Sequence, residues 1–335
     1  GFIFGFTKGV NCYMDHIKFA SIIVTYRCNA RCQMCNTWRY PSLKQEEIGI
    51  DVYAKLPFMG TLNITGGEPF VRDDIDEIVA CVKKKTRRIV ISTNGYFTDR
   101  ILEFFSKNKD VGVRISIEGL PSINDKIRGL KDGFERGIRT LVELNQMGVK
   151  DIGFGITICD DNSKDMLDLF YLAKMMGVEF ATAAIHNSFY FHKYDNHFIH
   201  PEIATDELRK LIGHLLKSKK IKDWFRAYFN YGLINYINNR PRLLPCEMGF
   251  DSFFLDPYGY ILPCNVLEQK MGNLVEQSFE EIWDSQVAQE IRKKVESCEK
   301  NCWMIGSVSQ QMKKYFWIPS LWILKHKYLK RRMLN

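Results

Sequence analysis

Short apolar segments alternate with helical segments over the first half of the chain. Six segments rich in Val, Ile and Phe have the length and composition of buried parallel strands: residues 19–27, 61–65, 87–93, 111–118, 151–159 and 178–184. The intervening segments, such as DIDEIVACVKKK and FERGIRTLVELNQMG, have helical patterns, and Gly148 ends the second one. Six strand–helix units in series predict an α/β fold, a partial (β/α)6 TIM-like barrel with right-handed crossovers.

The pattern changes after Ala184. Residues 185–200 are rich in His, Tyr, Phe and Asn and predict a loop, either an aromatic wall for a sugar-like or peptide substrate or a plain surface loop. Two helices are expected next, at roughly 204–219 and 221–238. FFL and YIL then flank the turn sequence Asp-Pro-Tyr-Gly at 256–259, which predicts a β-hairpin followed by short helices. We therefore divide the chain into an N-terminal extension (1–18), a core barrel (19–200), a helical connection (201–245), a small hairpin-plus-helix domain (246–304) and a basic amphipathic tail (305–335).

Charge is unevenly spread along the chain. The net charge is +8, but residues 311–335 carry seven Lys and Arg and no acidic residue, so the remaining body is near +1. This distribution describes a basic tail and not a nucleic-acid-binding face. No apolar run reaches ~18 residues, and the first residues lack the order of a signal peptide. We expect a cytoplasmic protein.

The tail, YFWIPSLWILKHKYLKRRMLN, predicts an amphipathic helix from about Pro319. Such a helix suits an anionic membrane surface, which would place the protein at the inner face of the membrane, or it docks on the protein's own barrel. The apolar side of the helical wheel carries Trp317, Leu321, Leu324 and Tyr328, with Ile318, Trp322 and Leu329 beside them and Lys327 and Lys330 opposite.

The cysteines carry the candidate chemistry. Disulfides are rare in large cytoplasmic proteins, and seven of the ten cysteines fall into two groups. In the first group, CNARCQMC places Cys28, Cys32 and Cys35 directly after the first strand. Three thiolates suit three corners of a 4Fe–4S cubane and leave one iron open, as in a catalytic metal site. A zinc site is the alternative, but no further His or Cys follows within the next forty residues.

With this spacing, and with Met34 before the last cysteine, the sequence resembles the radical S-adenosylmethionine (SAM) superfamily. In that family the open iron chelates the amino and carboxylate groups of SAM. An electron then cleaves SAM to a 5′-deoxyadenosyl radical, which takes a hydrogen atom from the substrate. The resemblance implies a 4Fe–4S cluster, SAM and a low-potential electron donor such as flavodoxin or ferredoxin.

Later segments extend the same resemblance. Gly66, Gly67, Glu68 and Pro69 follow the second strand, where the family has a loop that contacts the SAM amino group. These four residues and the candidates named next fall at the carboxyl ends of strands, where the active sites of barrels gather. Each could also be a strand cap or a core residue. The further implied SAM contacts are Ser92 and Asn94, Ser116 and Glu118 near the ribose, Arg128 at the carboxylate and Ile156 at the adenine.

The second cysteine group offers four thiolates: Cys246, Cys264, Cys298 and Cys302. Four ligands close a cluster, and the arrangement resembles the SPASM domain in its smaller, twitch-type form, which carries one auxiliary 4Fe–4S cluster. A zinc knuckle, or a cluster with one open iron, is the alternative. We therefore expect two 4Fe–4S clusters and SAM as cofactors.

The substrate is the open question. The hairpin spacing from Cys246 to Cys264 resembles that of radical SAM dehydrogenases that oxidise an aminocyclitol alcohol. It favours oxidation or epimerisation of an alcohol carbon on a carbohydrate or carbohydrate-lipid. Cys159, which ends the fifth strand, is a candidate hydrogen donor for epimerisation, or else a strand-end apolar residue.

Two alternative functions remain. The first is modification of a ribosomally made peptide by a SPASM-type maturase. Against it, only about eighteen residues precede the first strand, fewer than a leader-peptide-binding domain needs. The second, a non-enzymatic iron–sulfur electron carrier, does not explain the GGEP sequence or the open-site spacing.

Overall fold

A computed structural model describes residues 17–329 and shows one curved, nine-stranded sheet. Its strand order is β6-β5-β4-β3-β2-β1-β7-β8-β9, and neighbouring strands from β1 to β6 are parallel. This architecture confirms the α/β, partial-barrel fold expected from the sequence. The six barrel strands are β1 (Ile17–Ile23), β2 (Met59–Thr65), β3 (Thr86–Thr93), β4 (Gly112–Ser116), β5 (Ile152–Ile158) and β6 (Glu179–Ala184).

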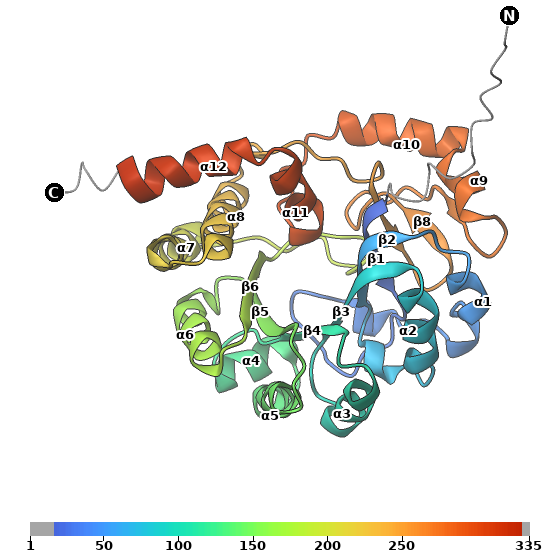
Figure 1. The fold of residues 1–335 in the computed structure, drawn as a ribbon, viewed down its shortest axis with the longest axis horizontal. Coiled ribbons are helices and arrows are strands. Elements are labelled where there is room, and N and C mark those ends of the chain that lie inside the picture. The colour runs from blue at the N-terminus through green and yellow to red at the C-terminus, as the bar shows by residue number, and fades with distance from the viewer. Residues whose placement is uncertain (1–16, 330–335) are drawn as a thin grey trace, which may run out of the picture.

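Helices cover the outer, convex face of this sheet (Figure 1). The alternation of side chains along each strand explains why. On β2, for example, Leu62 and Ile64 are fully buried in the core, whereas Thr61, Asn63 and Thr65 face an interior cavity. The covering helices are α1 (Ile50–Tyr53), α2 (Ile75–Lys83), α3 (Thr98–Lys107), α4 (Pro121–Arg128), α5 (Gly133–Gln146) and α6 (Met166–Met176).

The C-terminal hairpin continues the barrel sheet. β7 (Ser252–Leu255) pairs in parallel with β1, and β8 (Tyr260–Leu262) and β9 (Gly272–Asn273) follow antiparallel. The predicted turn is present, with the Asp256 carboxylate accepting from the backbone N–H groups of Tyr258 and Tyr260, both at 2.9 Å. Before the hairpin, the chain forms α7 (Pro201–Lys217) and α8 (Ile221–Ile237) beside β6, and after it come α9 (Phe279–Trp283) and α10 (Gln286–Glu296).

The tail forms α11 (Ile305–Lys314), α12 (Trp317–Leu324) and a π-helical turn, η5 (Lys325–Leu329). One side of α12 docks on the protein: Trp322 stacks on Tyr231 at 5.0 Å between ring centroids, and Ile323 is buried. The other side remains exposed. The predicted helix thus starts two residues before Pro319, and it is partly docked.

Parts of two predicted segments lie outside the described residues. They are most of the N-terminal extension (1–18) and the last tail residues, including Lys330. Within residues 17–329, no helix is long and apolar enough to cross a membrane.

Candidate functional site

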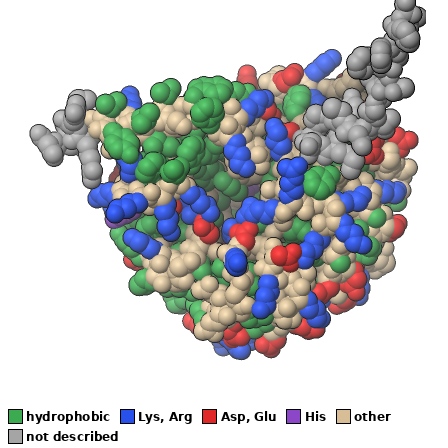
Figure 2. All heavy atoms as spheres, viewed as in Figure 1, with side chains coloured by type: hydrophobic (Ala, Val, Ile, Leu, Met, Phe, Trp, Pro, Cys, Tyr) green, Lys and Arg blue, Asp and Glu red, His purple; other side chains and the backbone are tan. Residues whose placement is uncertain are grey.

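A cavity of about 1440 Å³ runs through the barrel, and both cysteine groups line it. Figure 2 shows a hollow on one face of the molecule, bordered by hydrophobic side chains on one side and by Lys and Arg on the other. All nine cysteines in the described part of the chain are free thiols. Two groups that lie more than 200 residues apart in the sequence therefore face one shared space.

The first cysteine group sits on the loop after β1. Backbone N–H groups point at two of its sulfurs: Ala30 donates to Cys28 Sγ and Thr37 donates to Cys35 Sγ, each at 3.4 Å. Hydrogen bonds to sulfur are a means by which proteins tune iron–sulfur clusters. Burial raises the pKa of Cys28 to about 12, so the pocket alone keeps this thiol protonated. A bound metal would deprotonate it.

The loop after β6 fixes the first cysteine loop, a function that sequence reasoning missed. The Asn36 N–H donates to the Phe191 carbonyl at 2.8 Å, and Asn196 Nδ2 donates to the Met34 carbonyl at 3.1 Å. Tyr190 is buried, and its hydroxyl donates to the Gly66 carbonyl at 2.5 Å. The aromatic composition of this loop was the available signal, but no residue spacing indicated these partners.

The two glycines after β2 allow a close backbone approach. A Cβ on Gly66 or Gly67 would collide with the backbone carbonyls of Thr25 or Arg27, whose segment leads into the cysteine loop. The Gly67 N–H donates to the Thr25 carbonyl at 2.7 Å. Glycine is therefore required here to seat this loop against the cysteine loop.

Glu68 is buried between the same loops. Its carboxylate accepts from Thr93 Oγ1 and from the Asn94 N–H, both at 2.7 Å, and from the Phe70 N–H at 3.2 Å. Burial raises its pKa, and these three donors oppose the shift. Glu68 lines the cavity, but most of the hydrogen bonds that its carboxylate can accept are used to join the loop after β2 to the end of β3.

Ser92 lines the cavity, where its hydroxyl donates to Asn63 Oδ1 at 2.9 Å. Asn94 does not line the cavity. Its Nδ2 instead donates to Asn29 Oδ1 at 2.7 Å and so ties the end of β3 to the cysteine loop. Pro69 is buried at the start of a short 3-10 helix, η3 (Pro69–Val71), and does not line the cavity either.

At the end of β4, Ser116 and Glu118 both line the cavity. The buried Glu118 carboxylate accepts from Arg128 at 3.0 Å and from the Thr157 N–H at 2.6 Å. Burial disfavours the charged guanidinium, but nearby Cys32 and Glu118 raise the pKa of Arg128 above its ordinary value. Arg128 is thus a fixed positive charge beside the first cysteine group.

The structure does not bring two of the expected residues to the cavity. Ile156 packs in the hydrophobic core, while its neighbour Thr157 lines the cavity, because successive residues of a strand point to opposite faces. Cys159 follows β5 but does not line the cavity. Burial raises the pKa of its thiol to about 11.

The second cysteine group lies around a half-buried arginine, Arg242. Arg242 donates to the carbonyl oxygens of Leu244 at 2.8 Å, Ser307 at 2.9 Å and Cys302. Burial lowers the pKa of Arg242, while all four thiols of the group oppose that shift. The Leu267 N–H donates to Cys264 Sγ at 3.2 Å. These contacts provide a positive charge and a sulfur-directed N–H for an anionic cluster.

The cysteine sulfurs of the described residues are not gathered as a single zinc ion would require. A single tetrahedral zinc with ~2.3 Å bonds would bring its sulfurs to about 3.8 Å from one another. Within residues 17–329, no three cysteine sulfurs lie within 4.8 Å of one another. Two buried donors near the first group, Asn29 Nδ2 and Arg128 Nε, also have no partner. The first site therefore has spare buried donors for a polar ligand beside its three thiols.

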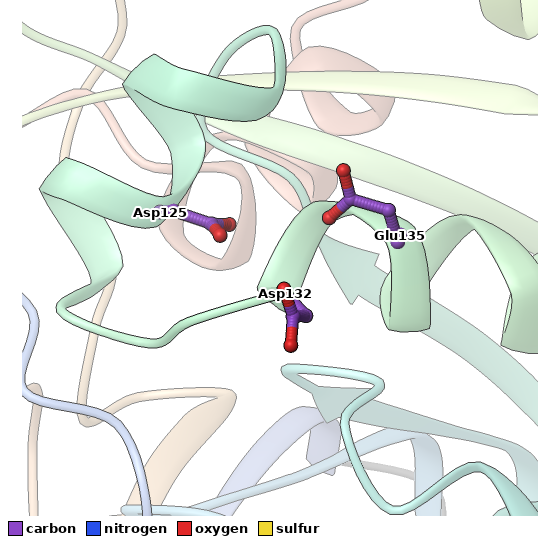
Figure 3. Close-up of side chains that lie close together, drawn as sticks. All are labelled: Asp125, Asp132 and Glu135. Atoms are coloured by element: carbon purple, nitrogen blue, oxygen red, sulfur yellow. The ribbon is translucent and has the colours of Figure 1, made fainter.

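Three acidic side chains come together elsewhere: Asp125 on α4, and Asp132 and Glu135 at the start of α5 (Figure 3). Their carboxylate oxygens lie within 4.8 Å of one another. Asp125 accepts from the Phe134 N–H at 3.0 Å and so joins the two helices. None of the three lines the cavity, and we assign them this local structural role.

Comparison with known proteins agrees with this geometry. Residues 22–172 match the radical SAM superfamily, and residues 246–303 match SPASM, an iron–sulfur cluster-binding domain. The structure resembles Streptococcus suis SuiB bound to S-adenosylmethionine, with a TM-score of 0.64 and 15% identity over 86% of this chain and 73% of that one. It also resembles anSMEcpe with bound AdoMet, with a TM-score of 0.62 and 16% identity over 92% of this chain and 98% of that one. These likenesses establish the fold.

Among curated relatives, an Fe-coproporphyrin III synthase of Methanosarcina barkeri is 34% identical over 158 residues, 44% of this chain and 39% of its own length. The subtilosin biosynthesis protein AlbA of Bacillus subtilis is 26% identical over 79% of this chain and 59% of its own. The sporulation killing factor maturation protein SkfB, also of B. subtilis, is 25% identical over 85% and 68%. The chain thus spans less than two thirds of the first two relatives. It belongs to the radical SAM superfamily, carries a SPASM domain, and has S-adenosylmethionine and 4Fe–4S clusters as its cofactors.

Proposed function

We propose that this radical SAM enzyme modifies a peptide. The carrying observation is the cavity of about 1440 Å³ that both cysteine groups share, which opens as a hollow on one face of the molecule (Figure 2) and so gives a peptide a route to the proposed SAM site. Two of the relatives that align over most of the chain, AlbA and SkfB, are named for a bacteriocin and for a killing factor. Neither they nor the Methanosarcina relative is named for a carbohydrate, so we place the carbohydrate or carbohydrate-lipid substrate second.

The cysteine assignments are part of this proposal. Cys28, Cys32 and Cys35 would hold the SAM-binding cluster, and the four cysteines around Arg242 would hold the auxiliary cluster. When bound and reduced, the first cluster supplies the electron that converts SAM to a 5′-deoxyadenosyl radical. A flavodoxin or ferredoxin is the proposed reductant.

The chain's own residues bind and orient SAM in this scheme. Arg128, held by Glu118, presents a fixed cation to the SAM carboxylate. Glu68 contributes its remaining accepting capacity to the SAM ammonium. Ser92, Ser116 and Thr157 line the cavity at the carboxyl ends of their strands and suit the ribose hydroxyls.

Oxidation is the proposed outcome, and epimerisation is less favoured. An epimerase of the expected type needs a thiol in the cavity to return a hydrogen atom. In the part of the chain that the structure describes, every cavity-lining cysteine is already a proposed cluster ligand, and Cys159 lies outside the cavity. The auxiliary cluster, when bound, supplies an acceptor for the second electron of an oxidation.

We also retain peripheral membrane contact as a proposal for the tail. The specific observation is the exposed apolar side of α12, where Trp317, Leu321 and Leu324 are each about half exposed or more. Exposed Trp and Leu beside Lys residues suit the interface of an anionic membrane.

Deuterium transfer tests the substrate class. The reconstituted, reduced enzyme is incubated with SAM and either a pool of peptides deuterated on carbon or a pool of deuterated carbohydrates. We expect deuterium in 5′-deoxyadenosine from the peptide pool. Deuterium from the carbohydrate pool alone would contradict the proposal, and a Cys28→Ala variant controls for cleavage that does not depend on the cluster.

A further inference from the structure

The cavity is strongly positive. Nine of its lining residues are Lys or Arg and only four are Asp or Glu. Two of the cations, Arg128 and Arg242, stand beside the cysteine groups, where anionic clusters would balance them. Two of the acids, Glu68 and Glu118, are held at the SAM end by the bonds described above. The remaining charges lie mainly at the other end of the barrel.

We call these charges at the far end the basic cluster: Arg88 on β3, Arg114 on β4, and Lys222 and Arg226 on α8. Arg88 and Arg114 share Asp151, at 2.8 and 2.7 Å. Lys222 and Arg226 share Glu179, and the lysine lies at 2.9 Å. Arg226 also lies 3.9 Å from Asp223, so three carboxylates face four cations and leave one positive charge without a counter-charge in the cluster.

The electrostatics agree with this count. Burial and the neighbouring Arg114 lower the pKa of Arg226 to about 10. Burial, Arg114 and Arg88 likewise lower the pKa of Lys222, although Asp151 and Asp223 partly oppose the shift. A cation whose charged form is disfavoured by other cations stands in a positive field that an added anion would relieve.

The barrel interior is open between the basic cluster and the SAM end. Gly155 on β5 lies beside Ala181 on β6, and the small side chains of Ala181 and Ala183 line the cavity there. Arg114 and Ser116 face the cavity from the same strand, two residues apart, which is ~7 Å at the usual strand rise. Arg88 and Ser92 are four residues apart, or ~13 Å. An extended peptide would cover this distance in about two to four residues.

We propose that the basic cluster binds a carboxylate of the peptide substrate, two to four residues from the carbon that is modified. The inference rests on the proposed peptide function and deepens it. The carboxylate comes from an acidic side chain or from the peptide's C-terminus, because both present the planar pair of oxygens that guanidinium groups bind. The basic cluster would thereby set which residue of the peptide reaches SAM.

Three rhodamine-labelled octapeptides test this inference. The first contains two Glu and has an amidated C-terminus, the second replaces both Glu by Gln, and the third is the Gln peptide with a free carboxylate. Fluorescence anisotropy measures their binding to the holoenzyme with SAM. We expect the Glu peptide or the free-acid peptide to bind at least about tenfold more tightly than the Gln amide, and the difference to shrink in high salt.

Variants locate the effect. Arg114→Gln/Arg226→Gln should reduce the preferred peptide to the affinity of the Gln amide. Arg139→Gln is the matched control, because Arg139 pairs with Glu143 on the outside of the barrel and does not line the cavity. If circular dichroism shows that the double variant does not fold, Lys222→Gln replaces it, because the Lys222 side chain is 63% exposed and its loss should not disturb the fold. Lys222→Gln should weaken binding of the preferred peptide about threefold.

Equal binding of all three peptides to the wild type would overturn the charge selection and leave the peptide function standing. Binding of none of them, with SAM still cleaved, would overturn both. Unchanged preference in Arg114→Gln/Arg226→Gln would also refute the role of the basic cluster.

Discussion

Tyr190 shows how a single hydroxyl holds the site together. It is buried, lines the cavity and donates to the Gly66 carbonyl, at the start of the GGEP loop. We predict that Tyr190→Phe lowers the free energy of unfolding by about 1–2 kcal/mol, because the carbonyl loses its donor. SAM affinity should fall several-fold as the loop loosens. Urea unfolding and equilibrium binding measure the two effects.

Tyr194→Phe is the control for this prediction. Tyr194 belongs to the same loop after β6 but is 67% exposed, so its variant should match the wild type in both measurements. Equal behaviour of the two variants would show that the bond to Gly66 does not support the site.

The Glu118–Arg128 pair is buried, so its two members depend on each other. Arg128→Met should lower the free energy of unfolding by about 3–5 kcal/mol, because it leaves the Glu118 carboxylate buried without its cation. Adding Glu118→Gln should recover part of that loss, since the buried charge is gone. Urea unfolding of the two single variants and the double variant gives the coupling energy. Additive losses would contradict the pairing.

At this scale the sequence predicted the residues that short motifs identify. Cys28, Glu68 and Ser116 all line the cavity, as expected from their positions after strands. The sequence indicated Ile156, whereas Thr157 lines the cavity. A buried strand of a parallel sheet is apolar on both faces, so its sequence does not reveal which residues point inward. Tyr190 escaped prediction because its partner is 124 residues away.

Among the elements, α12 combines a docked side and an exposed side. Trp322 stacks on Tyr231 and His326, whereas Trp317, Leu321 and Leu324 face outward. We predict that full-length protein floats with anionic vesicles at low salt and less at high salt. Replacing the three exposed residues by Ser should abolish flotation and leave stability nearly unchanged. Liposome flotation and thermal melting measure the two properties.

Trp322→Ser is the matched variant on the docked side. It should lower the melting temperature, because it removes the stacking on α8, but it should still float. Flotation that survives the loss of all three exposed residues would assign α12 a purely structural role.

The sequence predicted the hairpin at 252–262 from its turn residues but not its position in the fold. β7 pairs with β1 across more than 200 residues, and a pattern of apolar positions carries no information about such a distant partner. This pairing explains why the second cysteine group, whose Cys246 and Cys264 flank the hairpin, reaches the barrel cavity.

For the whole molecule, the two cysteine groups, most of the SAM-contacting candidates and the basic cluster face one cavity. The sequence indicated the two groups separately through their spacing. It could not show that the basic cluster joins them, because Arg88, Arg114 and Arg226 come from three elements that meet only in the folded barrel. The sequence therefore showed the positive charge of the tail but not the positive charge of the cavity.

The most direct measurement is the iron content and SAM cleavage of a Cys28→Ala/Cys32→Ala/Cys35→Ala variant beside the wild type. The anaerobically reconstituted wild type should hold about eight irons per chain and release 5′-deoxyadenosine when reduced. The variant should keep about four irons, in the cluster around Arg242, and should release none. Cleavage of SAM by the variant, or an iron content equal to that of the wild type, would contradict the assignment of the catalytic cluster to these three cysteines.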